Sequence, residues 1–218
     1  MNKMVAVILS GCGNRDGGEI HESVTTLLAI KKAGYDYQCF APDIMQHRVV
    51  NHLTGETVSE KRSVIVEAAR IARGKIKPLS DFQEKDFAAL FIPGGQGAAL
   101  NLSTFGVDGP NCTVNTDVTR AVTVMHKAGK PIGALCIAPV ILGRILQGVC
   151  VTIGNDVNVN AKLHQMGAKT KDAACDAFVA DENNKVVTGP CYMYDASILD
   201  VANCAERVVQ KTLEMIKS

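Results

Sequence analysis

A short apolar stretch that ends in a cysteine is the feature that most constrains how this chain of 218 residues can fold. Residues 132–135 carry no charge and predict a short strand buried on both faces. Residues 137–144 have the apolar spacing of a buried helix, and Pro139 falls in its first turn, where a missing N–H costs little. Cys136 therefore lies on a sharp turn from a strand into a helix.

The surroundings of Cys136 match the nucleophile elbow, in which the middle residue of a G-x-S-x-G sequence projects into a cleft. Ala134 and Ala138 stand in for the two glycines, and Cys136 stands in for the serine. A thiol at a helix N-terminus meets free N–H groups and the helix dipole. We therefore expect a lowered pKa and the fastest alkylation of the eight cysteines, with Cys12 and Cys191 as competing loop thiols. The alternative is a buried cysteine that only fills space.

Strands and helices alternate along the rest of the chain, which predicts an α/β fold with an open, mostly parallel sheet and helices on both faces. Residues 4–9 predict a strand, residues 19–33 a helix and residues 35–41 a second strand, so this part is a β–α–β unit. The other expected elements are strands at 87–92, 149–153, 178–180 and 185–187, and helices near Ala98 and at 114–128, 157–166 and 196–216.

The chain is expected to form a single domain over residues 1–218, because its length suits one hydrophobic core. An insertion at about 43–78 interrupts the alternation with a hairpin that turns at Thr54-Gly55. A helix capped by Ser59 and ended by Gly74 follows the hairpin. We expect this insertion to pack on the edge of the sheet, because it is too short to hold a core of its own.

Three loops follow predicted strands, at residues 11–18, 93–97 and 136–139. The carboxyl ends of parallel strands meet at one edge of a sheet, which is where ligands bind in open α/β folds. The convergence of two glycine-rich loops and a cysteine elbow on that edge favours a catalytic role for Cys136.

Several groups near this edge are candidates for work with the thiol. Glu22 and His21 lie in the first turn of the first helix, and either could act as a base, a choice that the sequence leaves open. Glu19 is expected to serve only as a partner of the helix dipole. The N–H groups of Gly95 and Ile137 are expected to donate to an oxyanion, one from each loop.

Nucleotide and metal sites fit the residues poorly. Gly11 and Gly13 follow a strand as in a dinucleotide-binding loop, but their spacing differs from G-x-G-x-x-G and acidic residues follow where pyrophosphate would bind. Cys12, His21 and Glu22 lack any recognised metal-ligand spacing. We therefore expect no metal and no cofactor.

Composition limits the partners and the compartment. A net charge of +1 with 5% aromatic residues argues against nucleic acid as a partner. The longest apolar run, at about 132–142, is too short to span a membrane, and the run at 5–9 is too short for a signal peptide. Eight cysteines without a C-x-x-C pair predict reduced thiols in the cytoplasm.

Several motifs together make the chain similar to the PfpI/ThiJ superfamily, and within it to the ElbB-like branch, which has bacterial and mitochondrial animal members. The motifs are Ser10-Gly11-Cys12-Gly13, Glu19-Ile20-His21-Glu22, Asn51-His52-Leu53-Thr54-Gly55-Glu56, Pro93-Gly94-Gly95 and Cys136-Ile137-Ala138-Pro139. The resemblance implies the flavodoxin-like fold of class I glutamine amidotransferase domains, a nucleophile at Cys136, a partner carboxyl at Glu22 and a homodimer. It also implies the mitochondrial matrix as the location if the chain is the processed form of an animal relative.

The same resemblance implies cofactor-independent glyoxalase activity, sometimes described as deglycase activity. Protease-type members carry His directly after the cysteine, where this chain has Ile137. Amidotransferases use a late His and Glu, and residues 188–192 contain no such pair. The first hypothesis is therefore a glyoxalase- or deglycase-like hydro-lyase of low activity that acts on glyoxal or methylglyoxal through a Cys136 hemithioacetal. The second is a non-enzymatic redox sensor or partner-binding protein with an oxidisable Cys136 and Cys12 as the resolving thiol.

Overall fold

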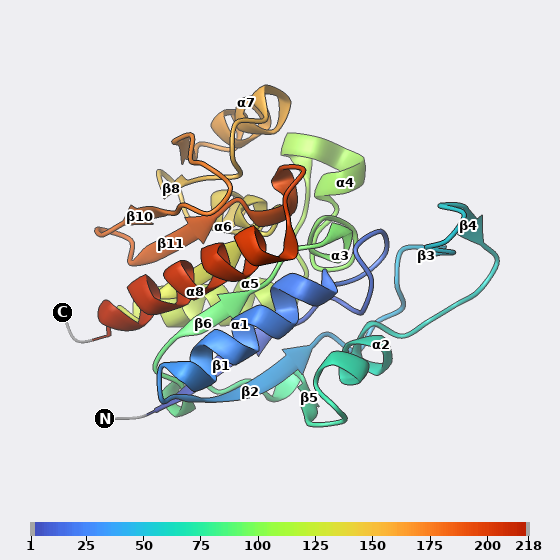
Figure 1. Cartoon of the computed structure of the whole chain (residues 1–218), viewed down its shortest axis with the longest axis horizontal. Coiled ribbons are helices and arrows are strands. Elements are labelled where there is room, and N and C mark those ends of the chain that lie inside the picture. Colours follow the sequence, from blue (N-terminus) through green and yellow to red (C-terminus); the bar gives the residue numbers. More distant parts are fainter. Residues whose placement is uncertain (1–2, 217–218) are drawn as a thin grey trace.

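The computed structural model describes residues 3–216 and is built around one seven-stranded sheet (Figure 1). The strand order is β10–β11–β7–β6–β1–β2–β5; β10 runs antiparallel to β11, and the other neighbours are parallel. The strands of this sheet are β1 (Met4–Ile8), β2 (Asp36–Ala41), β5 (Ile76–Pro78), β6 (Leu90–Ile92), β7 (Ile132–Leu135), β10 (Val179–Asp181) and β11 (Val186–Gly189). This is the open, mostly parallel sheet that the sequence predicts.

Helices cover both faces of the sheet, as the alternation of elements predicts (Figure 1). They are α1 (Ile20–Lys32), α2 (Val64–Ile71), α3 (Gln96–Leu100), α4 (Phe105–Asp108), α5 (Thr116–Lys127), α6 (Pro139–Ile145), α7 (Val157–Gln165) and α8 (Ile198–Glu214). Val5 and Val7 of β1 pack in one core with residues of α1, while Ala6 and Ile8 pack in the other with residues of α5 and α6. Burial on both faces explains why β1 reads as a continuous apolar run.

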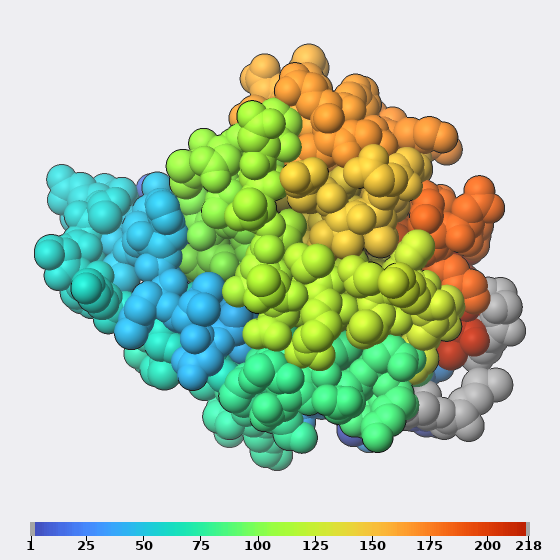
Figure 2. Space-filling view, turned by 180° about the vertical axis from the view of Figure 1, so that it is seen from behind, coloured from blue at the N-terminus to red at the C-terminus, as the bar shows by residue number. Residues whose placement is uncertain are grey.

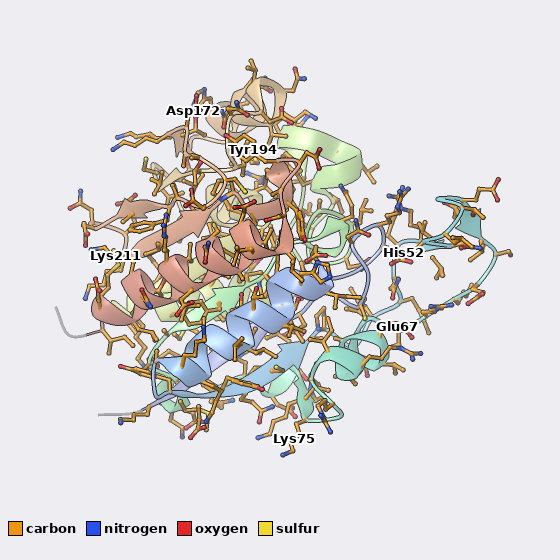
Figure 3. All side chains as sticks on the ribbon, viewed as in Figure 1. His52, Glu67, Lys75, Asp172, Tyr194 and Lys211 are labelled. Atoms are coloured by element: carbon orange, nitrogen blue, oxygen red, sulfur yellow. The ribbon has the colours of Figure 1, made fainter. Side chains whose placement is uncertain are left out.

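The insertion differs in part from the expectation. Strands β3 (Val49–Val50) and β4 (Thr57–Val58) form the predicted hairpin, but it stands out from the body instead of packing on the edge of the sheet (Figures 1 and 2). Figure 3 marks the hairpin side of the molecule with His52 and the opposite side with Lys211 on α8. The N-cap residue of helix α2 is Ser63 and not Ser59, the residue that the sequence analysis expected.

The edge position of the sheet is taken by β5, a strand that the sequence pattern does not predict. It pairs in parallel with β2 over three residues and ends at Pro78. Proline lacks an N–H, and an edge strand tolerates it because one side of that strand has no neighbour to receive a hydrogen bond. The end of the insertion is thus part of the main sheet.

Smaller differences lie at the ends of elements. The strand expected at 87–92 is shortened to β6, which begins at Leu90, after a 3₁₀ turn at Glu84–Asp86. The segment expected as a strand at 149–153 forms β8 (Cys150–Val151), which pairs with β9 (Lys169–Thr170) outside the main sheet. Further 3₁₀ turns span Leu79–Asp81, Gly109–Asn111 and Cys191–Met193. Across residues 3–216, every helix is too short or too polar to cross a membrane.

Candidate active site

Cys136 lies where β7 ends and the chain turns into α6, as the sequence predicts. Its φ of 57° is in the left-handed region, which side chains other than glycine rarely adopt. The Cys136 N–H donates to the Gly189 carbonyl (2.8 Å), and the Ala138 N–H donates to the Leu135 carbonyl (2.9 Å). These bonds fix the sharp turn and tie it to the end of the neighbouring strand β11.

Glu22 extends from the first turn of α1 to the thiol of Cys136, and its side chain is fully buried. The Gly94 N–H donates to Oε2 of Glu22 (2.9 Å), and the Tyr192 N–H donates to Oε1 (3.3 Å). The thiol of Cys136 hydrogen-bonds the same carboxyl group. Donors from three separate segments therefore hold Glu22 in one position.

The start of α1 explains how Glu22 reaches this place. Glu19 is the N-cap residue of the helix, and its Oε2 accepts a hydrogen bond from the Glu22 N–H (2.7 Å). The structure thus gives Glu19 a capping role, in line with the expectation that it only complements the helix terminus. The cap fixes the first turn and so the direction from which Glu22 approaches the thiol.

Gly94 leaves no room for a side chain between the two reactive groups. A Cβ atom at this position would lie 2.5 Å from the Cβ of Cys136 and 2.7 Å from Oε2 of Glu22. Such distances lie well inside van der Waals contact. The glycine is therefore required for the carboxyl and the thiol to meet while the Gly94 N–H donates to Glu22.

Burial dominates the protonation of the pair. Loss of solvent, helped by the charge of Glu19, raises the pKa of Glu22 to about 8, against the opposing effect of the hydrogen bonds from Tyr192, Cys136 and Gly94. Burial and the Glu22 charge also raise the pKa of the Cys136 thiol well above its usual range. The expected lowering of the thiol pKa is therefore wrong, because desolvation outweighs the N–H groups at the start of α6. Both groups of the pair therefore hold their protons more tightly than an exposed carboxyl group and an exposed thiol do.

The two expected oxyanion donors converge on the thiol. The backbone N–H groups of Gly95 and Ile137 both hydrogen-bond the sulfur of Cys136, one from each loop. Gly95 has φ +94°, and a Cβ there would lie 2.3 Å from the Glu19 nitrogen, so only glycine fits. The two donors therefore approach the sulfur from different loops.

Between the two candidate bases, the structure brings Glu22 and not His21 to the thiol. His21 is exposed, and its Nδ1 hydrogen-bonds the hydroxyl of Tyr192 (2.8 Å). Tyr192 is a site residue that the sequence analysis missed, since it was considered only as part of a segment without a His–Glu pair. It follows β11, the neighbour of β7, so the parallel pairing of these strands is the signal that could have found it.

The other thiols are placed differently from expectation. Cys12 is half-buried, and the charges that raise the pKa of its thiol come from Glu67 and Asp16, so its neighbours are not those of Cys136. Cys191, expected as an accessible loop thiol, is 0% exposed, because the turn at Cys191–Met193 packs against α8. The thiols of Cys204 and Cys136 and the carboxyl of Glu22 all raise the pKa of Cys191. Cys191, and not Cys12, is therefore the thiol that belongs to the surroundings of Cys136.

Residues 3–216 contain no group of three or more His, Cys, Asp or Glu side chains that could hold a metal ion. All eight cysteines are free thiols. The groups that contact the sulfur of Cys136 are the carboxyl group of Glu22 and the backbone N–H groups of Gly95 and Ile137.

Solved structures share the fold. The crystal structure of an isoprenoid biosynthesis protein with an amidotransferase-like domain from Ehrlichia chaffeensis matches with a TM-score of 0.90 and 34% identity, over 97% of this chain and 99% of that one. The crystal structure of glyoxalase III from Candida albicans matches with a TM-score of 0.62 and 18% identity, over 95% of this chain and 96% of that one. The second match shows the fold alone.

Sequence relatives extend over nearly the whole chain. The human protein named glutamine amidotransferase-like class 1 domain-containing protein 3, mitochondrial, is 41% identical over 221 residues, which cover 97% of this chain and 82% of the relative. The mitochondrial ES1 protein of Danio rerio is 32% identical and covers 97% of this chain and 87% of the relative. The sequence profile of the DJ-1/PfpI family matches residues 14–194. By this match and these relatives, the chain belongs to the DJ-1/PfpI family.

Proposed function

We propose that this protein is a cofactor-independent glyoxalase-type enzyme that converts small dicarbonyls such as glyoxal and methylglyoxal to 2-hydroxy acids. The observation that carries the proposal is the buried pair of Cys136 and Glu22, which share a hydrogen bond under two N–H donors. A nucleophile, a proton carrier and an oxyanion hole are the parts that this reaction needs. The shared fold with a glyoxalase III is consistent with it.

In the first step the sulfur of Cys136 attacks the aldehyde carbon of the dicarbonyl, and the thiol proton passes to the carboxylate of Glu22. The aldehyde oxygen becomes negative as the carbon–sulfur bond forms. The N–H groups of Gly95 and Ile137 lie beside the sulfur and stabilise that oxygen. Return of the proton from Glu22 gives a neutral hemithioacetal.

In the second step the carboxylate of Glu22 removes the proton from the former aldehyde carbon and passes it to the neighbouring carbonyl oxygen, which gives an enediol. Glu22 then takes the proton of the hydroxyl group on the first carbon and delivers it to the second carbon, which forms a thioester of a 2-hydroxy acid. Water then hydrolyses the thioester and regenerates the thiol, so one dicarbonyl and one water yield one 2-hydroxy acid. A carboxyl group with a pKa of about 8 suits this work, because it can both hold and release a proton near neutral pH.

The direct test measures lactate formation from methylglyoxal by the full chain and by Cys136→Ala. We expect the variant to fall to the rate without enzyme, because no other group supplies the sulfur. Cys39→Ala, which removes a buried thiol of β2, is the matched control and should keep its activity. A near wild-type rate in Cys136→Ala would overturn the proposed mechanism.

A redox role is the second candidate, and the position of Cys191 favours a specific form of it. Peroxide would oxidise the Cys136 thiol to a sulfenic acid, with water as the other product. The Cys191 thiol would then condense with the sulfenic acid to a disulfide and release a second water. Mass spectrometry after mild peroxide should show a Cys136–Cys191 disulfide with negligible dicarbonyl turnover; rapid turnover without selective oxidation would reject this role.

We also infer that the active form is a homodimer in a reducing compartment, either the cytoplasm or the mitochondrial matrix. The eight free thiols fit such a compartment. The human and zebrafish relatives are named as mitochondrial proteins. Sedimentation equilibrium of the full chain should give twice the mass of one chain; a single-chain mass at micromolar concentration would contradict the dimer.

A further inference from the structure

A polar hollow lies between the loop after β1, the β3–β4 hairpin and helix α3. Its volume is about 400 Å³, within the range of pockets that hold small molecules. Its polar lining includes Arg15 from the loop, Arg48 and Thr57 from the hairpin, and Gln96 from α3. In Figure 2 the hairpin forms a lobe at one edge of the molecule, beside the surface of the segment near residue 100.

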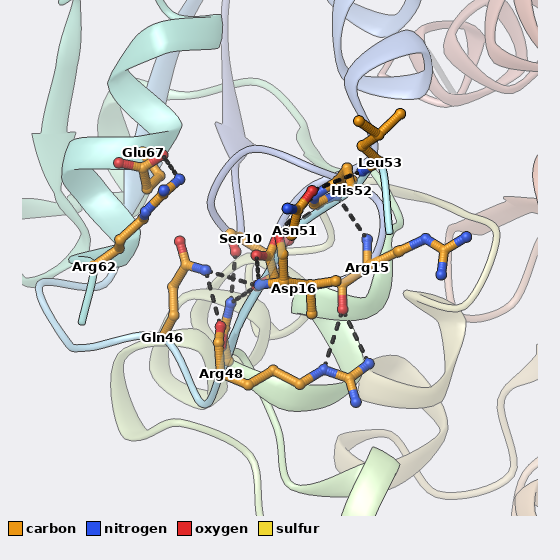
Figure 4. A network of polar contacts seen from close by, with 12 residues as sticks. Ser10, Arg15, Asp16, Gln46, Arg48, Asn51, His52, Leu53, Arg62 and Glu67 are labelled. Atoms are coloured by element: carbon orange, nitrogen blue, oxygen red, sulfur yellow. Dashed lines mark hydrogen bonds and ion pairs between the residues drawn. The ribbon is translucent and has the colours of Figure 1, made fainter. Parts of the chain in front are cut away.

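Specific hydrogen bonds hold the loop and the hairpin together around this hollow (Figure 4). The guanidinium group of Arg48 donates from Nε and Nη2 to the Arg15 carbonyl, at 3.3 and 3.0 Å. The Arg15 N–H donates to Nε2 of His52 (3.3 Å), and the Val50 N–H donates to the carboxylate of Asp16 (2.7 Å). These bonds hold the Arg48 side chain against the backbone of Arg15 and fix the hairpin to the loop.

The positive charge of the hollow is uncompensated. Among residues 3–216, neither Arg15 nor Arg48 forms an ion pair with a carboxylate, whereas Arg70 pairs with the buried carboxylate of Glu67. Both arginines line the same hollow, and a bound anion would be attracted by both positive charges. The planar fork of arginine donors matches phosphate and carboxylate groups in particular.

Gly55 at the turn of the hairpin lies against the guanidinium group of Arg15. It has φ +80°, and a Cβ at this position would lie 2.8 Å from Nη1 of Arg15. A side chain there would displace the arginine. The hairpin turn therefore leaves room for Arg15 at the wall of the hollow.

The hollow and the candidate active site share a wall. Gln96, which lines the hollow, directly follows Gly95, whose N–H hydrogen-bonds the sulfur of Cys136. Consecutive Cα atoms are about 3.8 Å apart, so the two regions are separated by little more than one peptide unit at this point. A small molecule with a reactive carbonyl at one end and a charged group at the other could contact both.

We propose that the hollow binds the phosphate or carboxylate group of a small anionic substrate whose carbonyl end reaches Cys136. This inference rests on the proposed function, and it names the substrate class. The preferred dicarbonyl carries a negatively charged group, which Arg15 and Arg48 bind. Unsubstituted methylglyoxal then uses only the catalytic half of the site.

The first experiment measures binding without catalysis. Isothermal titration of the full chain with inorganic phosphate should show one saturable site, and Arg15→Gln and Arg48→Gln should each weaken it about fivefold to tenfold. Arg73→Gln, which removes an exposed arginine elsewhere on the surface, is the matched control and should bind phosphate like the wild type. Absent binding in the wild type, or equal binding by all variants with unchanged thermal melting, would overturn the proposal.

The second experiment compares two substrates. The wild type should turn over 2-oxo-3-phosphooxypropanal with a higher kcat/KM than methylglyoxal, and both arginine variants should lose that preference. The surface control Arg73→Gln should keep the preference and the wild-type rate on methylglyoxal. Equal rates on both substrates, or phosphate that binds without competing with the phosphorylated dicarbonyl, would overturn the substrate role of the hollow. If neither substrate reacts, the proposed function fails, while the titration still decides whether the hollow binds anions.

Discussion

The candidate active site and the arginine hollow share a wall but are built in opposite ways. Glu22 is 0% exposed and Cys136 is 7% exposed, and burial raises the pKa of both side chains. Arg15 and Arg48 lie at the surface and stay charged. The buried pair thus depends on the removal of solvent, whereas the hollow depends on exposed charge. A substitution can therefore alter one region without altering the other.

The largest effect is expected from Glu22→Gln, which removes the carboxyl group of the buried pair. Glutamine keeps the size and hydrogen bonding of the side chain but cannot accept a proton. We expect kcat/KM for methylglyoxal to fall about 10²–10⁴-fold, the usual contribution of a general acid–base. A loss of only a few-fold would shift this role to His21.

Glu67→Gln is the matched control for that variant. Glu67 is also a buried carboxylate, 5% exposed, but it pairs with Arg62 and Arg70 away from the thiol. Its substitution should lower stability and leave the rate on methylglyoxal within about twofold of the wild type, since no proton transfer involves it.

The pH dependence of stability should differ between the wild type and Glu22→Gln. Folding raises the pKa of Glu22 from 4.5 to about 8, so between these values the folded chain holds a proton that the unfolded chain has lost. The stabilisation that comes from this bound proton is fully present below pH 4.5. It is lost as the pH rises to about 8, which lowers the free energy of unfolding by roughly 3–5 kcal/mol. Urea unfolding from pH 4.5 to 8.5 should show this fall in the wild type, and a parallel fall in Glu22→Gln would contradict it.

Gly94→Ala should test how tightly the buried pair is packed. The added methyl group meets Cys136 and Glu22 at 2.5 and 2.7 Å, so we expect a loss of about 3 kcal/mol in stability and a loss of activity. Gly34→Ala is the control, because nothing lies within 4 Å of its Cβ and only the strain of φ +78° remains, at about 1 kcal/mol. Equal melting temperatures for the two variants would mean that the pair has room to move.

The smallest effect should come from salt. Raising the ionic strength from about 0.01 M to about 0.15 M shortens the screening length from about 30 to about 8 Å. Binding of phosphate to the exposed arginines should weaken by a few-fold, whereas turnover of methylglyoxal at the buried pair should change little. Salt effects of the same size on both measurements would contradict the division of the site into a buried and an exposed half.

Much of the fold was predictable from the sequence, because β1 and β7 are continuous apolar runs and α8 has a regular apolar spacing. Strand β5 could not be predicted, since three residues that end in Pro78 carry no recognisable pattern. It forms because β2 offers it an open edge. The hairpin was found from its turn at Gly55, but its direction depends on contacts with Asp16 that are distant in the sequence.

The candidate site was predictable only in part, for similar reasons. Cys136, Glu22, Gly95 and Ile137 were placed near one another because each follows or precedes an element at the same sheet edge. The protonation of Cys136 could not be predicted, because the pKa of a thiol depends on how much solvent the finished fold removes. Tyr192, Cys191 and the arginine hollow depend on long-range pairing, and an exposed arginine in a sequence looks like any solvated residue.

The left-handed backbone of Cys136 has a consequence for how this chain can change over generations. A non-glycine residue in that conformation costs roughly 1–2 kcal/mol, which glycine would relieve and which offsets the small cavity left by a lost thiol. Selection for folding alone therefore has little reason to keep a cysteine at position 136.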